Sequence, residues 1–235
     1  AIIAAELGKL VSKKTKVDII VTPLVTIFSG CGLAYLFAPY IGTAASSVGN
    51  LIMWATTQQP FLMGILVSVI VGVALTLPIS SAAICAALGL TGLAGGAAVA
   101  GCCAQMIGFA VISFRDNGWG GFFAQGIGTS MLQVPNIVKK PLIWLPVILS
   151  SAVLGPVSTM LLHMTNNATG SGMGSAGFVG QIMTWQVMAQ TEHPVVVLLK
   201  IVMIQFMLPA VLTVVFAQFM RKHNFIKDGD MKLDL

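Results

Sequence analysis

Charge is scarce in this 235-residue chain. Only 8% of the residues are Asp, Glu, Lys or Arg, whereas soluble domains carry roughly 25%. None of these four residue types occurs within residues 19–114 or within residues 141–191. A helix of about 20 mostly apolar residues can cross a bilayer, so charge-free tracts of this length predict several crossings. The composition excludes a soluble globular domain and predicts an all-α, polytopic transmembrane helical bundle.

The patterns of common catalytic and metal sites are also missing. The sequence has no glycine-rich phosphate loop and no arrangement of Ser, His and Asp typical of a hydrolase. Its four cysteines lie in apolar runs without CxxC spacing, and we interpret them as small core residues. We therefore predict no cofactor, no metal site and no catalytic residue in this chain.

The few cations lie beside the apolar segments. This placement is typical of cytoplasmic loops of membrane proteins, so the net charge of +5 is no sign of a nucleic-acid partner. We expect both termini to be cytoplasmic and residues 41–59 to lie on the opposite side. The lysines that carry this prediction are Lys9, Lys13, Lys14, Lys16, Lys139, Lys140, Lys222, Lys227 and Lys232.

Five segments are apolar enough to cross the membrane. Residues 41–59 and 119–138 are more polar and are expected at the interface. Gly64, Ser68 and Gly72 fall four apart in the second span, a spacing that lets another helix approach closely. The expected spans are residues 17–38, 60–77, 97–114, 142–164 and 195–220.

Two segments are broken by glycine. Residues 165–186 (TNNATGSGMGSAGFVGQIMTWQ) are polar but uncharged and lie between two long apolar segments. Residues 79–96 hold a short apolar stretch followed by four glycines. Non-helical backbone at membrane depth occurs where protein buries it or where it lines a watery cavity. Residues 165–186 are thus the first candidate for a substrate site, the alternative being an extramembrane loop.

A possible internal repeat links the two segments. Phe37-Ala38-x-x-Ile41-Gly42-Thr43 recurs 86 residues later as Phe123-Ala124-x-x-Ile127-Gly128-Thr129. The same offset brings residues 79–96 onto residues 165–182. Charge placement would give the copies opposite orientation, as in secondary transporters. The repeat halves would be about residues 17–96 and 103–182 of a single transmembrane domain over residues 1–235, and we expect the two glycine-broken segments to meet near mid-membrane.

Amide side chains are the main candidates for substrate binding. They offer both hydrogen-bond donors and acceptors, which suits a neutral polyol such as a sugar. Two ionisable residues are further candidates: His163, which alternatively lies at the water interface, and Glu192, which alternatively belongs with His193 to a polar turn before Pro194. The candidate amides are Gln105, Gln133, Asn136, Asn166, Asn167 and Gln181.

Four motifs resemble a known family. They are SSAAICAALGLTGLAGG, CCAQMIGFAVISFRDNG, FFAQGIGTSMLQVPNI and GSGMGSAGFVGQI. In this order they are similar to the membrane-embedded EIIC permease of bacterial phosphotransferase systems, in its shorter, stand-alone branch, over about residues 9–221. Thr191-Glu192 is only a fragment of the Gly-Ile-Thr-Glu motif of better-known branches.

The resemblance implies a multi-pass protein of the bacterial cell membrane, in contact with lipid and usually a homodimer. It further implies sugar binding, with phosphorylation only through a separate cytoplasmic EIIB component, because no EIIB or EIIA domain is seen in the sequence. We therefore expect a carrier for a small neutral polar solute of the sugar class. The alternatives are a non-transporting membrane sensor derived from an EIIC permease, and a channel.

Overall fold

The computed structural model describes Glu6, Lys9 and residues 18–233. Lys13, Lys14 and Lys16 of the expected basic loop lie outside the described residues. The chain divides into two compact units, Ala1–Ser47 and Val48–Leu235, and each is described by itself. The expected single domain and its repeat halves stay predictions.

The described part of the first unit is helical. It belongs to α2 (Asp18–Gln58), which has Pro23 and Pro39 in its interior. We expected a span ending at residue 38 and a separate segment over residues 41–59; this boundary was wrong, because the helix continues past Pro39. The Thr43 hydroxyl donates to the Pro39 carbonyl at 2.8 Å, within the helical turn that follows the proline.

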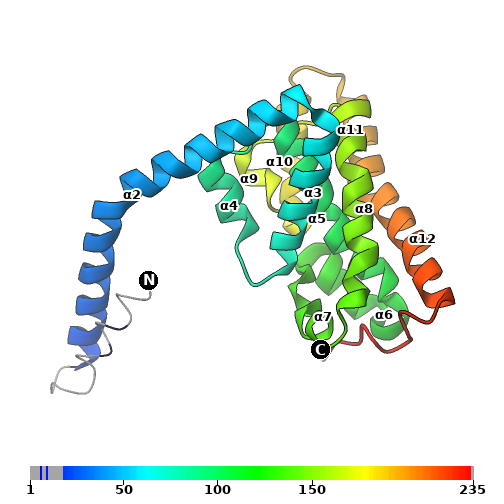
Figure 1. The fold of residues 1–235 in the computed structure, drawn as a ribbon, viewed down its shortest axis with the longest axis horizontal. Helices are drawn as coiled ribbons and strands as arrows, with labels where there is room; N and C mark the ends of the chain where they lie inside the picture. The colour runs from blue at the N-terminus through cyan, green and yellow to red at the C-terminus, as the bar shows by residue number, and fades with distance from the viewer. Residues whose placement is uncertain (1–5, 7–8, 10–17, 234–235) are drawn as a thin grey trace. The chain divides into compact units, whose positions relative to one another are not determined.

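A bundle of helices forms the centre of the second unit. α3 (Pro60–Thr76), α5 (Gly92–Ile112) and α8 (Leu145–Pro156) pack against one another, and α12 (Leu208–Lys222) lies along α5 and α8 (Figure 1). α5 is the core element: 94% of its most apolar stretch is buried. Its many Gly, Ala and Cys residues have little side-chain volume, so neighbouring backbones come close on all sides.

The predicted small-residue stripe on α3 is a packing surface. A Cβ atom at Gly64 would lie 3.1 Å from the Gly155 carbonyl oxygen, and one at Gly72 would lie 2.9 Å from the Gly101 carbonyl oxygen. Between them, the Ser68 hydroxyl donates to the Ser151 carbonyl at 2.7 Å. The stripe therefore brings α3 against both α8 and α5, which confirms the interpretation as packing.

Prolines coincide with wide turns in two long helices. Pro156 ends α8 and is followed by a π-helical turn, Val157–Leu161. Pro209 is the second residue of α12 and lies two residues after the π-helical turn Met203–Met207, which continues α11 (Pro194–Val202). Proline has no N–H to donate to the preceding turn, and π-turns of this kind often mark functional sites.

Short elements complete the second unit. They are α4 (Ser81–Leu88), α6 (Phe114–Phe123), α7 (Val134–Lys139), α9 (Ala168–Ser171) and α10 (Val179–Met188). The order of a long helix, a short helix and a further helix occurs twice, as α3–α4–α5 and as α8–α9–α10. This order accords with the proposed repeat, whose inverted orientation stays a prediction.

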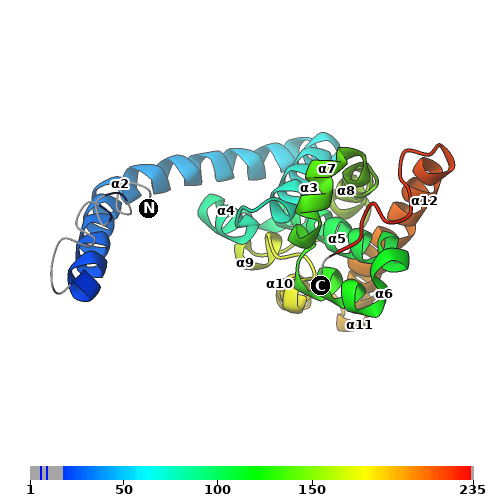
Figure 2. The ribbon, with the colours of Figure 1, turned by 90° about the horizontal axis from the view of Figure 1, so that it is seen from below.

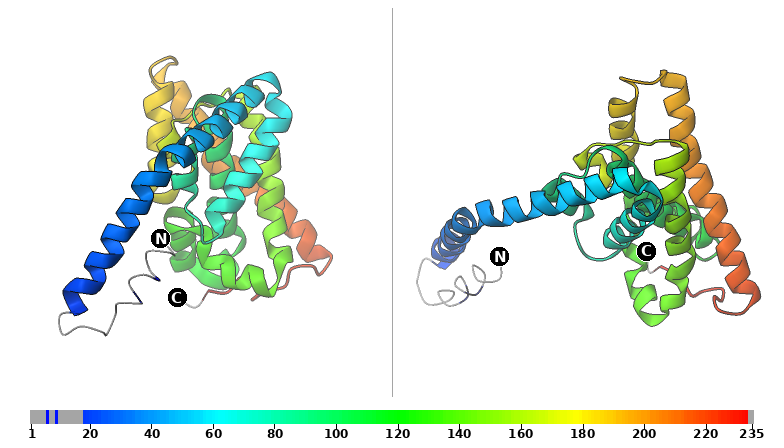
Figure 3. Two further views of the ribbon diagram at one scale, coloured as in Figure 1. Left: turned by 60° about the vertical axis from the view of Figure 1, so that its left-hand side comes forward. Right: turned by 45° about the horizontal axis from the view of Figure 1, so that its top comes forward.

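The two ends of the second unit differ in charge. α6, α7 and the C-terminal segment lie at one end, and the connection between α10 and α11 lies at the opposite end (Figures 1 and 3). In the view from below, α6, α7 and the C-terminus lie in the foreground (Figure 2). We call the first of these the basic end, because it carries Arg115, Lys139, Lys140, Arg221, Lys222, Lys227 and Lys232.

Among the described residues, three helices are long and apolar enough to cross a membrane: Gly92–Ile112, Pro141–Leu161 and Pro194–Lys222. They correspond to three of the five expected spans. α3 is apolar throughout but has only 17 residues, and Val21–Gly32 is a further short apolar helical stretch.

Candidate functional site

The two glycine-broken segments meet in the second unit. Gly92 and Asn166 exchange backbone hydrogen bonds of 3.0 and 3.3 Å in an antiparallel bridge. The Ser81 hydroxyl donates to the Gly172 carbonyl at 2.6 Å, and the Ser171 hydroxyl donates to the Leu90 carbonyl at 2.9 Å. The expected approach of the segments is confirmed; their depth in the membrane stays a prediction.

Glycine is required where these backbones touch. A Cβ atom at Gly96 would lie 1.9 Å from the Met164 carbonyl oxygen, and one at Gly172 would lie 2.5 Å from the Ser81 carbonyl oxygen. Both distances are far below van der Waals contact. The glycines marked as breaks in the sequence therefore allow the two segments to pair backbone to backbone.

Asn166 is the centre of a buried hydrogen-bond network. Its Nδ2 donates to the Gly180 carbonyl at 3.2 Å and to Thr184 Oγ1 at 3.1 Å, and its Oδ1 accepts from the Asn167 amide at 2.8 Å. Gln205 Nε2 also donates to Thr184 Oγ1, at 3.0 Å. The network joins residues 165–186 to the π-helical turn before α12, and none of these side chains is ionisable.

Two amide oxygens beside this network have no partner. The Oε1 atoms of Gln181 and Gln205 are buried and accept no hydrogen bond from the described residues. Gln181 uses only its Nε2, which donates to Cys103 Sγ at 3.4 Å. Gln181 and Thr184 are three residues apart on α10 and share a face. Leaving a buried acceptor unsatisfied costs roughly 1–3 kcal/mol, so each free oxygen needs an explanation.

Sequence reasoning missed Gln205. Gln205 is one of a few polar residues in the expected span 195–220, and we did not predict a role for it. A usable signal was present: Pro209 stands four residues later, where a helix would have sent an N–H to the Gln205 carbonyl. A polar side chain at such a position lies in a locally widened turn.

Asn167 and His163 stand at the edge of this arrangement. Asn167 caps α9, since its Oδ1 accepts from the Gly170 amide at 2.9 Å, and its Nδ2 donates to Met183 Sδ at 3.2 Å. His163 is exposed and has a left-handed backbone with φ of 47°. The structure therefore gives Asn167 a local structural role and places His163 at the surface; their part in substrate binding stays a prediction.

Gln105 belongs to a separate buried cluster. Its Oε1 accepts from Trp144 Nε1 at 2.8 Å and from Thr76 Oγ1 at 3.1 Å. Its Nε2 donates weakly to Ser151 Oγ at 3.4 Å. This amide joins the ends of α3 and α8 to the middle of α5, and both of its polar atoms are used within the chain.

Gln133 and Asn136 bind the C-terminal segment. Gln133 Nε2 donates to the Met231 carbonyl at 3.0 Å, and Asn136 Nδ2 donates to the Lys232 carbonyl at 2.9 Å. The two amides are also bonded to each other at 2.9 Å. The structure does not bring them together with Asn166, and their role in substrate binding stays a prediction.

Asp116 and Asn117, in the first turn of α6, hold the same segment. Asn117 Nδ2 donates to the Met231 carbonyl at 2.8 Å, and Asp116 Oδ1 accepts from the Gly229 amide at 3.0 Å. Lys140 forms an ion pair with Asp230. Partial burial raises the pKa of Asp230, but hydrogen bonds and charges from Lys140 and Lys227 outweigh it, so the pKa lies below its ordinary value.

Glu192 is held in an ion pair at the end opposite the basic end. Both of its carboxylate oxygens accept from Lys200 Nζ, at 2.8 and 2.7 Å, and the same ammonium donates to the Leu162 carbonyl at 2.9 Å. His193 caps α11 through Nδ1, which accepts from the Val195 amide at 3.3 Å. This geometry favours the polar-turn interpretation of Glu192 and His193 over a substrate-binding pair.

Comparison with known proteins agrees with this architecture. A family model described as "Phosphotransferase system, EIIC" matches residues 1–233, nearly the whole chain. Searches of curated proteins and of solved structures returned no match. Because the family model spans nearly all residues, this chain belongs to the EIIC family of the phosphotransferase system, a family of sugar-type membrane permeases.

Proposed function

We propose that this protein carries a small neutral polar solute, of the sugar class, across the membrane. The binding groups are the free amide oxygens of Gln181 and Gln205, beside the network of Asn166 and Thr184. The observation that carries this proposal is the pair of buried acceptors without partners. A sugar hydroxyl donating to each oxygen would supply the missing hydrogen bonds.

The contacts around the site support a carrier. The two glycine-broken segments are joined by backbone contact and by single serine bonds. Separating the two segments would break these contacts and would open the buried Asn166 and Gln181 to solute. Broken helices that meet at the substrate are typical of transporters.

A cytoplasmic EIIB component is the proposed phosphorylation partner. The basic end is the expected cytoplasmic side under the positive-inside rule, so EIIB would approach α6, α7 and the C-terminal segment. We further propose a multi-pass location in the bacterial cell membrane and a homodimer, as the family resemblance implies.

The test combines binding and transport. Purified protein is titrated with a panel of neutral hexoses, pentoses, hexitols and disaccharides, and uptake is measured in vesicles with and without phosphorylated EIIB. A carrier predicts at least one sugar that binds and accumulates in vesicles loaded with phosphorylated EIIB. Binding without uptake in any condition would favour the sensor instead. No binding across the panel, in protein that unfolds cooperatively, would refute the sugar site.

A further inference from the structure

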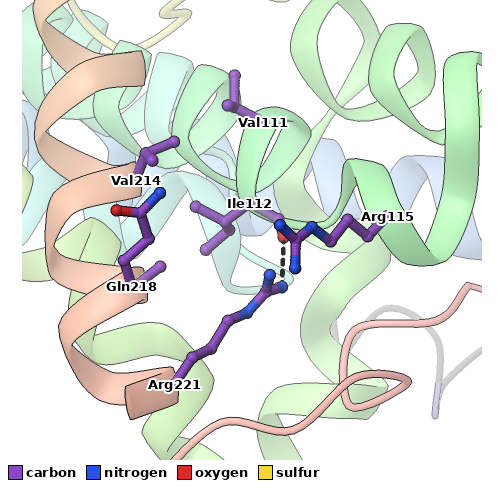
Figure 4. Close-up of a pocket in the computed structure, with 7 residues that line it drawn as sticks. Val111, Ile112, Arg115, Val214, Gln218 and Arg221 are labelled. Atoms are coloured by element: carbon purple, nitrogen blue, oxygen red, sulfur yellow. Dashed lines mark hydrogen bonds between the residues drawn. The ribbon is translucent and has the colours of Figure 1, made fainter.

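Two arginines face one another at the basic end. Arg115 lies in the first turn of α6, directly after α5, and Arg221 lies in the last turn of α12. They line one pocket of about 390 Å³, together with Gln218, and both also line an adjoining pocket. Figure 4 shows the two guanidinium groups pointing toward one another below Ile112.

The two guanidinium groups lack an acidic partner. Among the described residues, no carboxylate lies within ion-pair distance of either arginine. Asp116, the neighbour of Arg115, is occupied by backbone amides of the C-terminal segment. Asp228 and Lys227 line the adjoining pocket and bring one charge of each sign. These two charges cancel, so the lining of the two pockets keeps the positive charge of the two arginines.

Arg221 has N–H donors that no described residue uses. Its Nη2 donates to the carbonyl of Ile112, the last residue of α5, at 2.9 Å. Its Nε is buried and has no hydrogen-bond partner. A guanidinium has five N–H donors in a planar fork, and this fork matches phosphate oxygens in bidentate geometry. A group so held is ready to bind an anion.

We propose that Arg115 and Arg221 form a binding site for a phosphate group, supplied by an anionic phospholipid headgroup. Val111 and Val214 form apolar walls of the pocket, and the exposed Val211, Val215 and Phe219 continue an apolar stripe along α12. An acyl chain can lie on that stripe while its phosphate reaches the arginines. Basic pockets beside membrane helices bind such headgroups. The inference does not rest on the proposed sugar site.

The experiment measures lipid binding to the purified full chain in detergent. Phosphatidylglycerol, phosphatidylcholine, inorganic phosphate and a hexose phosphate are titrated separately, with native mass spectrometry and thermal unfolding as readouts. R115Q is the main variant, because no side-chain hydrogen bond or ion pair of Arg115 is described. K222Q removes the same charge from an exposed residue outside both pockets and is the control.

We expect R115Q to weaken phosphatidylglycerol binding by about tenfold or more, since charge-assisted hydrogen bonds are the strong ones. K222Q should bind as the parent does, and R115K should fall between them. If inorganic phosphate or hexose phosphate binds with the same dependence on Arg115, the site stands and its phosphate comes from a soluble ligand. Equal losses in R115Q and K222Q, or no binding of any probe to the parent, would overturn the proposal.

Discussion

Replacing Gln181 or Gln205 with Met should weaken sugar binding without lowering the stability of the folded protein. Each Oε1 is a buried acceptor without a partner, and removing an unsatisfied acceptor relieves a cost of roughly 1–3 kcal/mol. The variants lose one donor bond each, to Cys103 Sγ at 3.4 Å and to Thr184 Oγ1 at 3.0 Å. A typical bond contributes about 0.5–1.5 kcal/mol net, and Met fills a similar volume. The folded state should be as stable as the parent or more stable.

Sugar binding should respond in the opposite sense. If each oxygen accepts one sugar hydroxyl, each variant should lose about 0.5–1.5 kcal/mol of binding free energy. This corresponds to roughly a 2- to 12-fold rise in Kd. The double variant should lose more, though not the sum if both oxygens bind the same hydroxyl.

The assay pairs thermal unfolding with sugar titration on the same preparations. Each kcal/mol of stability shifts the unfolding midpoint by about 2–4 °C for a chain of this size, which is measurable. Gln190→Met is the matched control, because Gln190 is exposed at the end of α10 and bonds only locally. Variants that bind sugar like the parent while their unfolding midpoint rises would refute the site, since the oxygens would then be free without a ligand. Variants that unfold earlier would contradict the stability argument.

Four further perturbations test other parts of the structure. Gly96→Ala places a Cβ against the Met164 carbonyl and should unfold the site, whereas Gly120→Ala, with open space around it, should be silent in a thermal melt. Asn117→Ala removes a bond to the C-terminal segment and should speed its cleavage by trypsin; unchanged cleavage would argue against docking. Because Asp230 has a lowered pKa, its contribution should be present at neutral pH and fall away below about pH 4; amide exchange over residues 227–233 should rise there. Glu192→Gln removes the charge that pairs with Lys200, so it should lower the unfolding midpoint and leave sugar affinity unchanged. A loss of sugar affinity without a change in the unfolding midpoint would show that Glu192 binds the substrate.

Several features were predictable because they depend on local composition. A long tract without charged residues favours a membrane-spanning helix through its own composition, whatever its tertiary contacts. The stripe of Gly64, Ser68 and Gly72 follows from helical spacing alone, and the structure places α8 and α5 against it. The glycine-broken segments were predicted to meet, and the bridge between Gly92 and Asn166 joins them. The helix boundary at Pro39 was wrong, because a proline removes one backbone hydrogen bond without having to end the helix, and α2 continues through Pro39.

The partners of the amides were decided by tertiary structure alone. The sequence by itself determined an uncharged, amide-rich membrane helical protein, since residue type sets which hydrogen bonds a side chain can make. It did not determine which bonds are made. In the folded chain Gln133 donates to the distant Met231 carbonyl, and Gln105 accepts from Trp144. The Oε1 of Gln205 has no hydrogen-bond partner among the described residues. A hydrogen bond requires atoms within about 3 Å, and only the folded chain brings residues so far apart in sequence to that distance.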